Sequence, residues 1–78
     1  MLKLIKDKYG VYEIEGNYNR YEFTILTKDE NCGRGEYAEE IDVRAYGIGQ
    51  AKRIAQQVLT KEYIPGLRIA RVVITCKL

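Results

Sequence analysis

Residues 45–62 read AYGIGQAKRIAQQVLTKE, and the hydrophobic period changes within this stretch. Up to Gly47, apolar and polar residues alternate, which is typical of a strand with one buried face. Beyond it, apolar side chains recur at three- and four-residue spacing, which predicts an amphipathic helix from Ile48 to about Glu62. Ile64-Pro65-Gly66 ends this helix. The predicted apolar stripe consists of Ile48, Ala51, Ile54, Ala55, Val58 and Leu59.

Five strands are predicted around the helix, in the order β-β-β-β-α-β. Gly16-Asn17 is a tight-turn signal, so the second and third strands are predicted to form a hairpin. The polar segment 28–37 is predicted to be a loop. Hairpins favour an antiparallel sheet of four or five strands with the helix on one face, which is an α+β fold in a single domain, 1–78. The predicted strands span residues 2–6, 11–15, 20–27, 39–46 and 67–78.

The composition argues against an enzyme. The chain of 78 residues has no histidine, the commonest general base and metal ligand. Cys32 and Cys76 have no CxxC partner, whereas a structural zinc normally needs four ligands. Gly47-x-Gly49 lacks the third glycine of the dinucleotide fingerprint, because Lys52 stands there. We therefore predict no enzymatic activity, no cofactor and no metal.

The N-terminal segment lacks the apolar core of a secretory signal, and no apolar stretch approaches the length of a membrane span. These features predict a protein of the host cell cytoplasm that does not bind membranes. Reduced thiols are expected there. Cys76 lies in an apolar strand pattern and is predicted to be a core thiol, whereas Cys32 is predicted to be exposed in the polar loop.

The charge is divided between the two halves of the chain. Residues 1–43 carry −4 and residues 44–78 carry +6, so a partner that responds to an electric field is expected. The outer helix face has no acid until Glu62, and such a face suits phosphates or an acidic protein surface. Tyr12 and Tyr46 are either ordinary strand residues or residues that contact a partner, and the sequence does not decide between the two. The candidate partner-binding residues are Lys52, Arg53, Gln56, Gln57, Lys61 and Tyr46, with Arg44, Arg68 and Arg71 as an extension if their strands lie beside the helix.

Residues 45–55, AYGIGQAKRIA, resemble part of a small phage-encoded anti-CRISPR family that inhibits type I-F surveillance complexes. Its members have a strand, a Ser-Leu-Ser segment and a helix that begins Gln-Ala-Lys-Arg-Ile-Ala; here Gly47 and Gly49 replace the serines. The resemblance implies a non-enzymatic protein that binds the guide-carrying backbone subunit and obstructs pairing with target DNA. It also implies that Lys52 and Arg53 are contact residues.

The resemblance covers eleven residues of 78. The chain departs from the family after the helix start and has more strands before the helix and only one after it. The residues at which the helix departs from the family pattern are Gln57, Val58 and Leu59.

The favoured function is a phage or mobile-element inhibitor that binds a host CRISPR-Cas effector complex through its basic helix and competes with nucleic acid. An alternative is a small module that binds nucleic acid directly, with tyrosines stacking on bases. A third is a structural protein that self-associates through an edge strand such as 67–78. A monomer or weak homodimer is expected.

Overall fold

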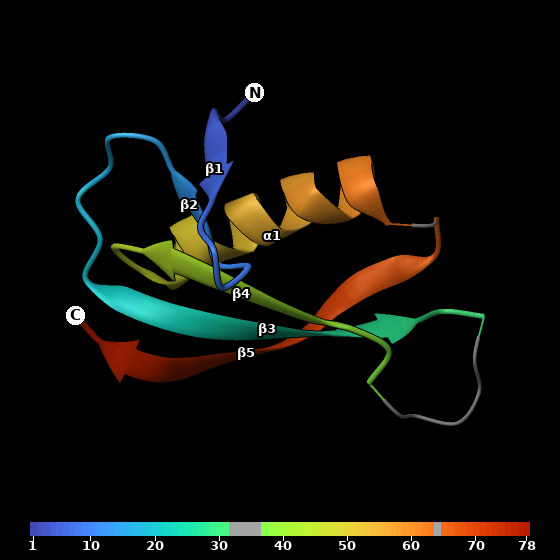
Figure 1. Cartoon of the computed structure of the whole chain (residues 1–78). Coiled ribbons are helices and arrows are strands. Elements are labelled where there is room, and N and C mark those ends of the chain that lie inside the picture. The colour runs from blue at the N-terminus through green and yellow to red at the C-terminus, as the bar shows by residue number, and fades with distance from the viewer. Residues whose placement is uncertain (32–36, 64) are drawn as a thin grey trace.

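The computed structural model describes residues 1–31, 37–63 and 65–78. A single sheet carries one helix on one of its faces, so the predicted α+β class is confirmed (Figure 1). Residue Cys32 and the middle of the predicted loop 28–37 lie outside the described residues. The elements are β1 (Leu4–Lys6), β2 (Tyr12–Ile14), β3 (Tyr21–Asp29), β4 (Glu40–Ala45), α1 (Ile48–Glu62) and β5 (Leu67–Lys77).

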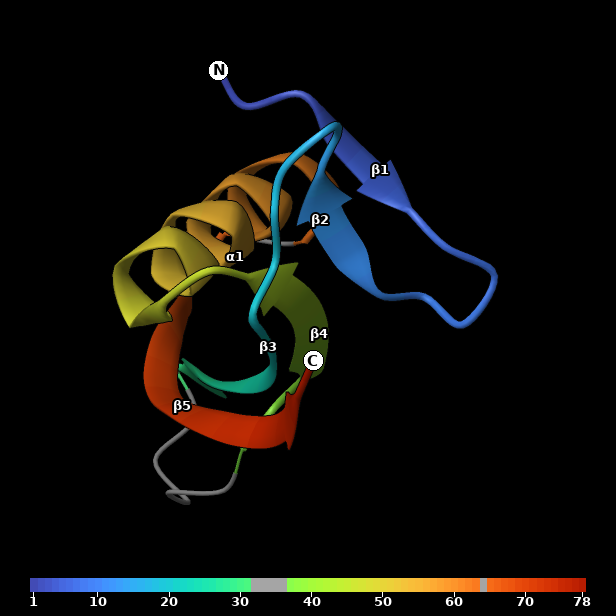
Figure 2. The ribbon, with the colours of Figure 1, turned by 90° about the vertical axis from the view of Figure 1, so that its left-hand side faces the viewer.

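The strands lie in the order β1-β2-β4-β3-β5. β3 is antiparallel to both β4 and β5, so these two strands run in the same direction on either side of it. α1 connects β4 to β5 by crossing over β3. Figure 2 shows that the sheet curls beneath the helix, so that β4, β3 and β5 partly surround the space below α1.

The predicted hairpin at Gly16-Asn17 is wrong. β2 pairs antiparallel with β1 and parallel with β4, through Tyr12 opposite Val43, so the sheet is mixed rather than wholly antiparallel. The hairpin that does form joins β1 to β2 at Asp7–Gly10, where the Gly10 N–H donates to the Asp7 carbonyl. The turn signal is local, whereas both edges of β3 are paired with strands longer than β2, namely β4 and β5.

The core lies between α1 and the sheet. Alternate residues of β3 and β4 face the helix, and the apolar stripe of α1 covers them. Ile48 belongs to the predicted stripe but is 48% exposed, because it stands at the first position of the helix. The core cluster consists of Phe23, Ile25, Ile41, Val43, Ala45, Ala51, Ile54, Ala55, Val58 and Leu59.

The pairing of β5 with β3 is irregular at two positions. The register shifts between Glu22 and Phe23 and again between Leu26 and Thr27. With these shifts, Ile69 lies opposite the buried Thr27 and packs against the core. Cys76 lies opposite Glu22 and is exposed, so its prediction as a core thiol is wrong.

The turn between α1 and β5 requires a glycine at position 66. Gly66 has φ +104°, and a Cβ there would lie 2.9 Å from Asn31 Nδ2. We expect Gly66→Ala to lower the free energy of unfolding by about 1–3 kcal/mol, measured by urea denaturation. Gly49→Ala is the control, because Gly49 lies in α1 and a Cβ added there would meet open space. That variant should gain about 0.5–1 kcal/mol; equal stability of the two variants would contradict the turn geometry.

Candidate interaction site

The exposed face of α1 is a basic surface. We define the basic helix surface as Lys52, Arg53, Gln56, Thr60 and Lys61, all of which are exposed. The buried stripe fixes the rotation of the helix and so turns these side chains to solvent. Within the described residues, none of the three cations makes an ion pair with a carboxylate. Their positive charge is therefore available to a partner.

The single acid of α1 is bound to the sheet. The Tyr12 hydroxyl of β2 donates a hydrogen bond of 2.5 Å to Glu62 Oε2. Burial raises the pKa of Tyr12, and the Glu62 carboxylate raises this pKa further, so the hydroxyl stays a donor. Tyr12, whose role the sequence left open, thus joins β2 to the end of the helix. Glu62 is correspondingly directed toward β2 rather than into the middle of the basic helix surface.

Gln57 holds the N-terminal segment. Its Nε2 donates to the Leu2 carbonyl at 2.7 Å, and its Oε1 accepts from the Leu2 N–H at 2.8 Å. Gln57 is half-buried, unlike its exposed neighbour Gln56. The amide acts as a short substitute for a strand partner, because it satisfies both the donor and the acceptor of one residue. A binding role predicted for Gln57 would compete with these two bonds.

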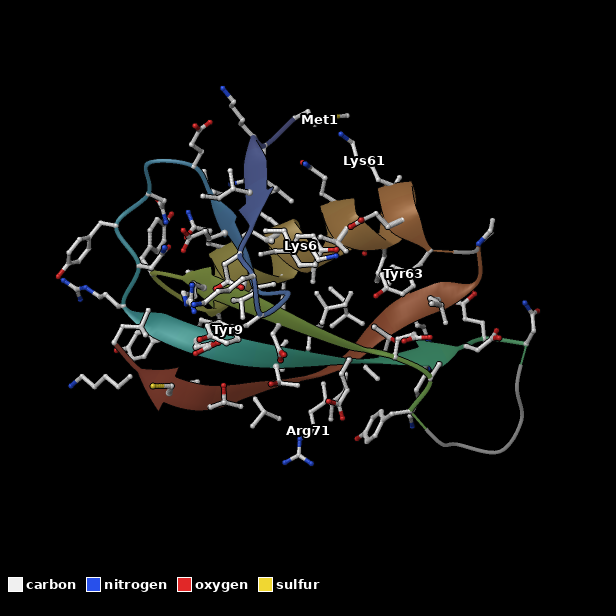
Figure 3. All side chains as sticks on the ribbon, viewed as in Figure 1. Met1, Lys6, Tyr9, Lys61, Tyr63 and Arg71 are labelled. Atoms are coloured by element: carbon white, nitrogen blue, oxygen red, sulfur yellow. The ribbon has the colours of Figure 1, made fainter. Side chains whose placement is uncertain are left out.

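Two grooves flank this contact. One of about 440 Å³ lies between the chain start and the basic helix surface. Another of about 450 Å³ lies between β1 and the second half of α1, and Lys6 and Lys61 are among its lining residues. Met1 and Lys61 both line the first groove and appear together above the helix in Figure 3. The residues that line the first groove are Met1, Leu2, Arg53, Gln56, Gln57, Thr60 and Lys61.

Arg44 and Arg71 project from the other face of the sheet. The Arg44 Nη1 lies 2.8 Å from Asp7 Oδ2, and the guanidinium is half-buried there. Hydrogen bonds from the Val11 and Tyr9 N–H groups, together with Arg44, hold the pKa of the Asp7 carboxyl below its ordinary value. Arg71 lies opposite Leu26 and points away from the helix in Figure 3. Neither arginine extends the basic helix surface.

The last two predicted residues lie at opposite ends of the helix. Arg68, at the start of β5, has Nε 3.8 Å from Glu30 Oε1. Tyr46 precedes the helix, is 55% exposed, and its N–H donates to Gln50 Oε1. Of the nine predicted residues, the structure therefore gathers four on one surface, namely Lys52, Arg53, Gln56 and Lys61. Sequence reasoning missed the chain start, because no local signal reports a contact that spans 55 residues.

Gln57→Leu tests the contact with the chain start. We expect the loss of two part-buried hydrogen bonds to lower the free energy of unfolding by about 1–2 kcal/mol. Amide exchange should also become faster in residues 2–6, as followed by NMR. Gln56→Leu is the matched control, because Gln56 is exposed on the same helix. A Gln57→Leu variant that keeps both the stability and the Leu2 amide protection of the Gln56→Leu variant would contradict this role.

The fold and the site define a small α+β domain with a basic helix surface. No family model, no curated protein and no solved structure matches this chain. α1, the helix that the structure describes, is neither long enough nor apolar enough to cross a bilayer.

Proposed function

We propose that this chain is a non-enzymatic interaction protein that docks through the basic helix surface onto a nucleic-acid-handling complex and competes there with nucleic acid. The observation that carries the proposal is the group of exposed cations Lys52, Arg53 and Lys61 on a helix whose single acid is bound by Tyr12. The specific form we propose is a phage or mobile-element inhibitor of a CRISPR-Cas effector in the host cytoplasm. Its support is the resemblance of residues 45–55.

Electrostatics and shape both favour a negatively charged macromolecular partner. Unpaired surface cations steer association and select partners with complementary potential. Arg53 and Lys61 also border a groove of about 440 Å³, which accepts a side chain from the partner. A protein surface that combines acidic groups with a protruding side chain fits this arrangement.

A direct nucleic-acid-binding module is the second candidate. The observation that favours it is the exposure of two tyrosines near the start of the helix, 77% for Tyr18 and 55% for Tyr46. Exposed aromatic rings beside cations stack on unpaired bases. Such binding weakens steeply with salt, since each neutralised phosphate releases counterions.

An affinity pull-down separates the two candidates. The tagged chain is incubated with a bacterial lysate, half of which has been treated with nuclease. Recovery of a defined protein complex from both halves is expected for the inhibitor and identifies its target. Recovery of nucleic acid alone, lost after nuclease treatment, would replace the proposal with the binding module. Recovery of neither from lysates that contain CRISPR effectors would contradict both.

A further inference from the structure

β5 forms one edge of the sheet. β5 spans eleven residues and is the longest strand that the structure describes, whereas β1, at the other edge of the sheet, has three. Among the described strands β5 pairs only with β3. Its other edge has no strand partner among the described residues, and such an edge is a template for an added strand.

The register with β3 gives the two faces of β5 different chemistry. Arg68 and Arg71 lie opposite Lys28 and Leu26, on the face away from the helix. Ile69, Val72 and Ile74 lie opposite the buried residues of β3, on the helix side. Ile74 is nevertheless 53% exposed, so apolar surface remains uncovered at this edge. The strand holds three basic residues and no acid.

We propose that β5 accepts an extended segment of a partner protein as a sixth strand, and that this segment alternates acidic and apolar residues. One acid would lie beside Arg71, and another would replace Glu30 as the partner of Arg68. Its apolar side chains would lie beside Val72 and Ile74, since cross-strand neighbours share a face. Main-chain hydrogen bonds give such a contact its affinity, and the alternate side chains give its specificity.

Charge argues against a second copy of the chain as the occupant. Two β5 strands side by side would bring six basic residues and no acid together. The added strand would centre on Arg71 to Ile74, because the register shifts interrupt the ladder on either side of this segment. This edge is separate from the basic helix surface, so the inference does not depend on the proposed function.

The test uses a fluorescent eight-residue peptide of alternating glutamate and valine. It is expected to bind the full chain in an anisotropy titration and to slow amide exchange in β5. Arg71→Glu should weaken binding about tenfold, by roughly 1.4 kcal/mol, and Arg71→Gln by less. Lys8→Glu is the control, since Lys8 lies in the β1–β2 turn and should leave the affinity unchanged. A peptide of alternating lysine and valine should not bind.

Four results would overturn the inference. The first is no binding of the glutamate–valine peptide. The second is equal binding of a glutamate–glycine peptide without protection of β5, which would indicate charge alone. The third is loss of binding in Arg53→Glu but not in Arg71→Glu, which would place the peptide on the helix. The fourth is sedimentation of the chain as a dimer whose β5 amides are already protected, which would make a second copy the occupant.

Discussion

Replacement of Phe23 by alanine is expected to lower the free energy of unfolding by about 3–5 kcal/mol. Phe23 is fully buried near the start of β3, opposite Val43 of β4 and Ile74 of β5. Its ring is tilted against that of Tyr21, with the centroids 6.0 Å apart. Within the described residues Phe23 is the one aromatic member of the buried core cluster, so its truncation removes the largest side chain of that cluster.

The size of the domain makes this loss decisive. A domain of this length folds with a net stability toward the lower end of about 5–15 kcal/mol, so the Phe23→Ala variant should be largely unfolded or close to it. Urea denaturation followed by circular dichroism measures the change. Ile74→Ala is the matched control, because Ile74 pairs with Phe23 but is half-exposed, and it should cost less than about 1.5 kcal/mol. Equal midpoints for the two variants would contradict the described core.

The helix and strands of this fold can be predicted from the local spacing of hydrophobic residues, but the pairing of the strands cannot. The change from alternation to helical spacing at Gly47 predicts α1, and the structure confirms its bounds at Ile48 and Glu62. The Gly16-Asn17 signal fails because a turn motif competes with pairing between distant strands. Tyr12 of β2 pairs with Val43, some thirty residues along the chain. The sequence around β2 contains no local pattern that indicates this pairing.

The candidate site shows the same limit. Lys52, Arg53 and Lys61 follow from helical spacing alone, since a known stripe fixes which side chains face solvent. The contacts of the neighbouring residues do not follow from helical spacing. Glutamine is a residue type that usually lies at the surface, yet the half-buried amide of Gln57 binds Leu2. Similarly, Arg44 contributes to the basic half of the sequence, but Asp7 neutralises it on the far face. Contacts across the chain decide which charges remain available.

The effective charge of the surfaces therefore differs from the division along the sequence. Acids and bases meet on the outer sheet face, where Arg44 contacts Asp7 and lies 3.9 Å from Glu13. The cations of α1 have no such partner within the described residues. A net charge of +2 thus conceals a helix surface of one sign, and this surface is what an approaching partner meets first.

Reversal of this surface should abolish partner binding while the domain stays folded. In the triple variant Lys52→Glu, Arg53→Glu and Lys61→Glu, the three substituted side chains are exposed, so the circular dichroism spectrum should match that of the parent chain. Binding to the complex recovered by pull-down should weaken about 100-fold or more, which is roughly 3 kcal/mol, because like charges across an interface repel. Surface plasmon resonance at fixed ionic strength measures the change.

A second triple variant separates the position of the charges from their sum. Lys8→Glu, Arg20→Glu and Lys77→Glu changes the net charge by the same amount at exposed sites away from the helix. Long-range attraction falls equally in both variants, so a loss confined to the helix variant indicates direct contact by its side chains. If the two variants lose affinity equally, net charge rather than the basic helix surface carries the interaction. If the folded helix variant binds as tightly as the parent chain, the partner docks elsewhere.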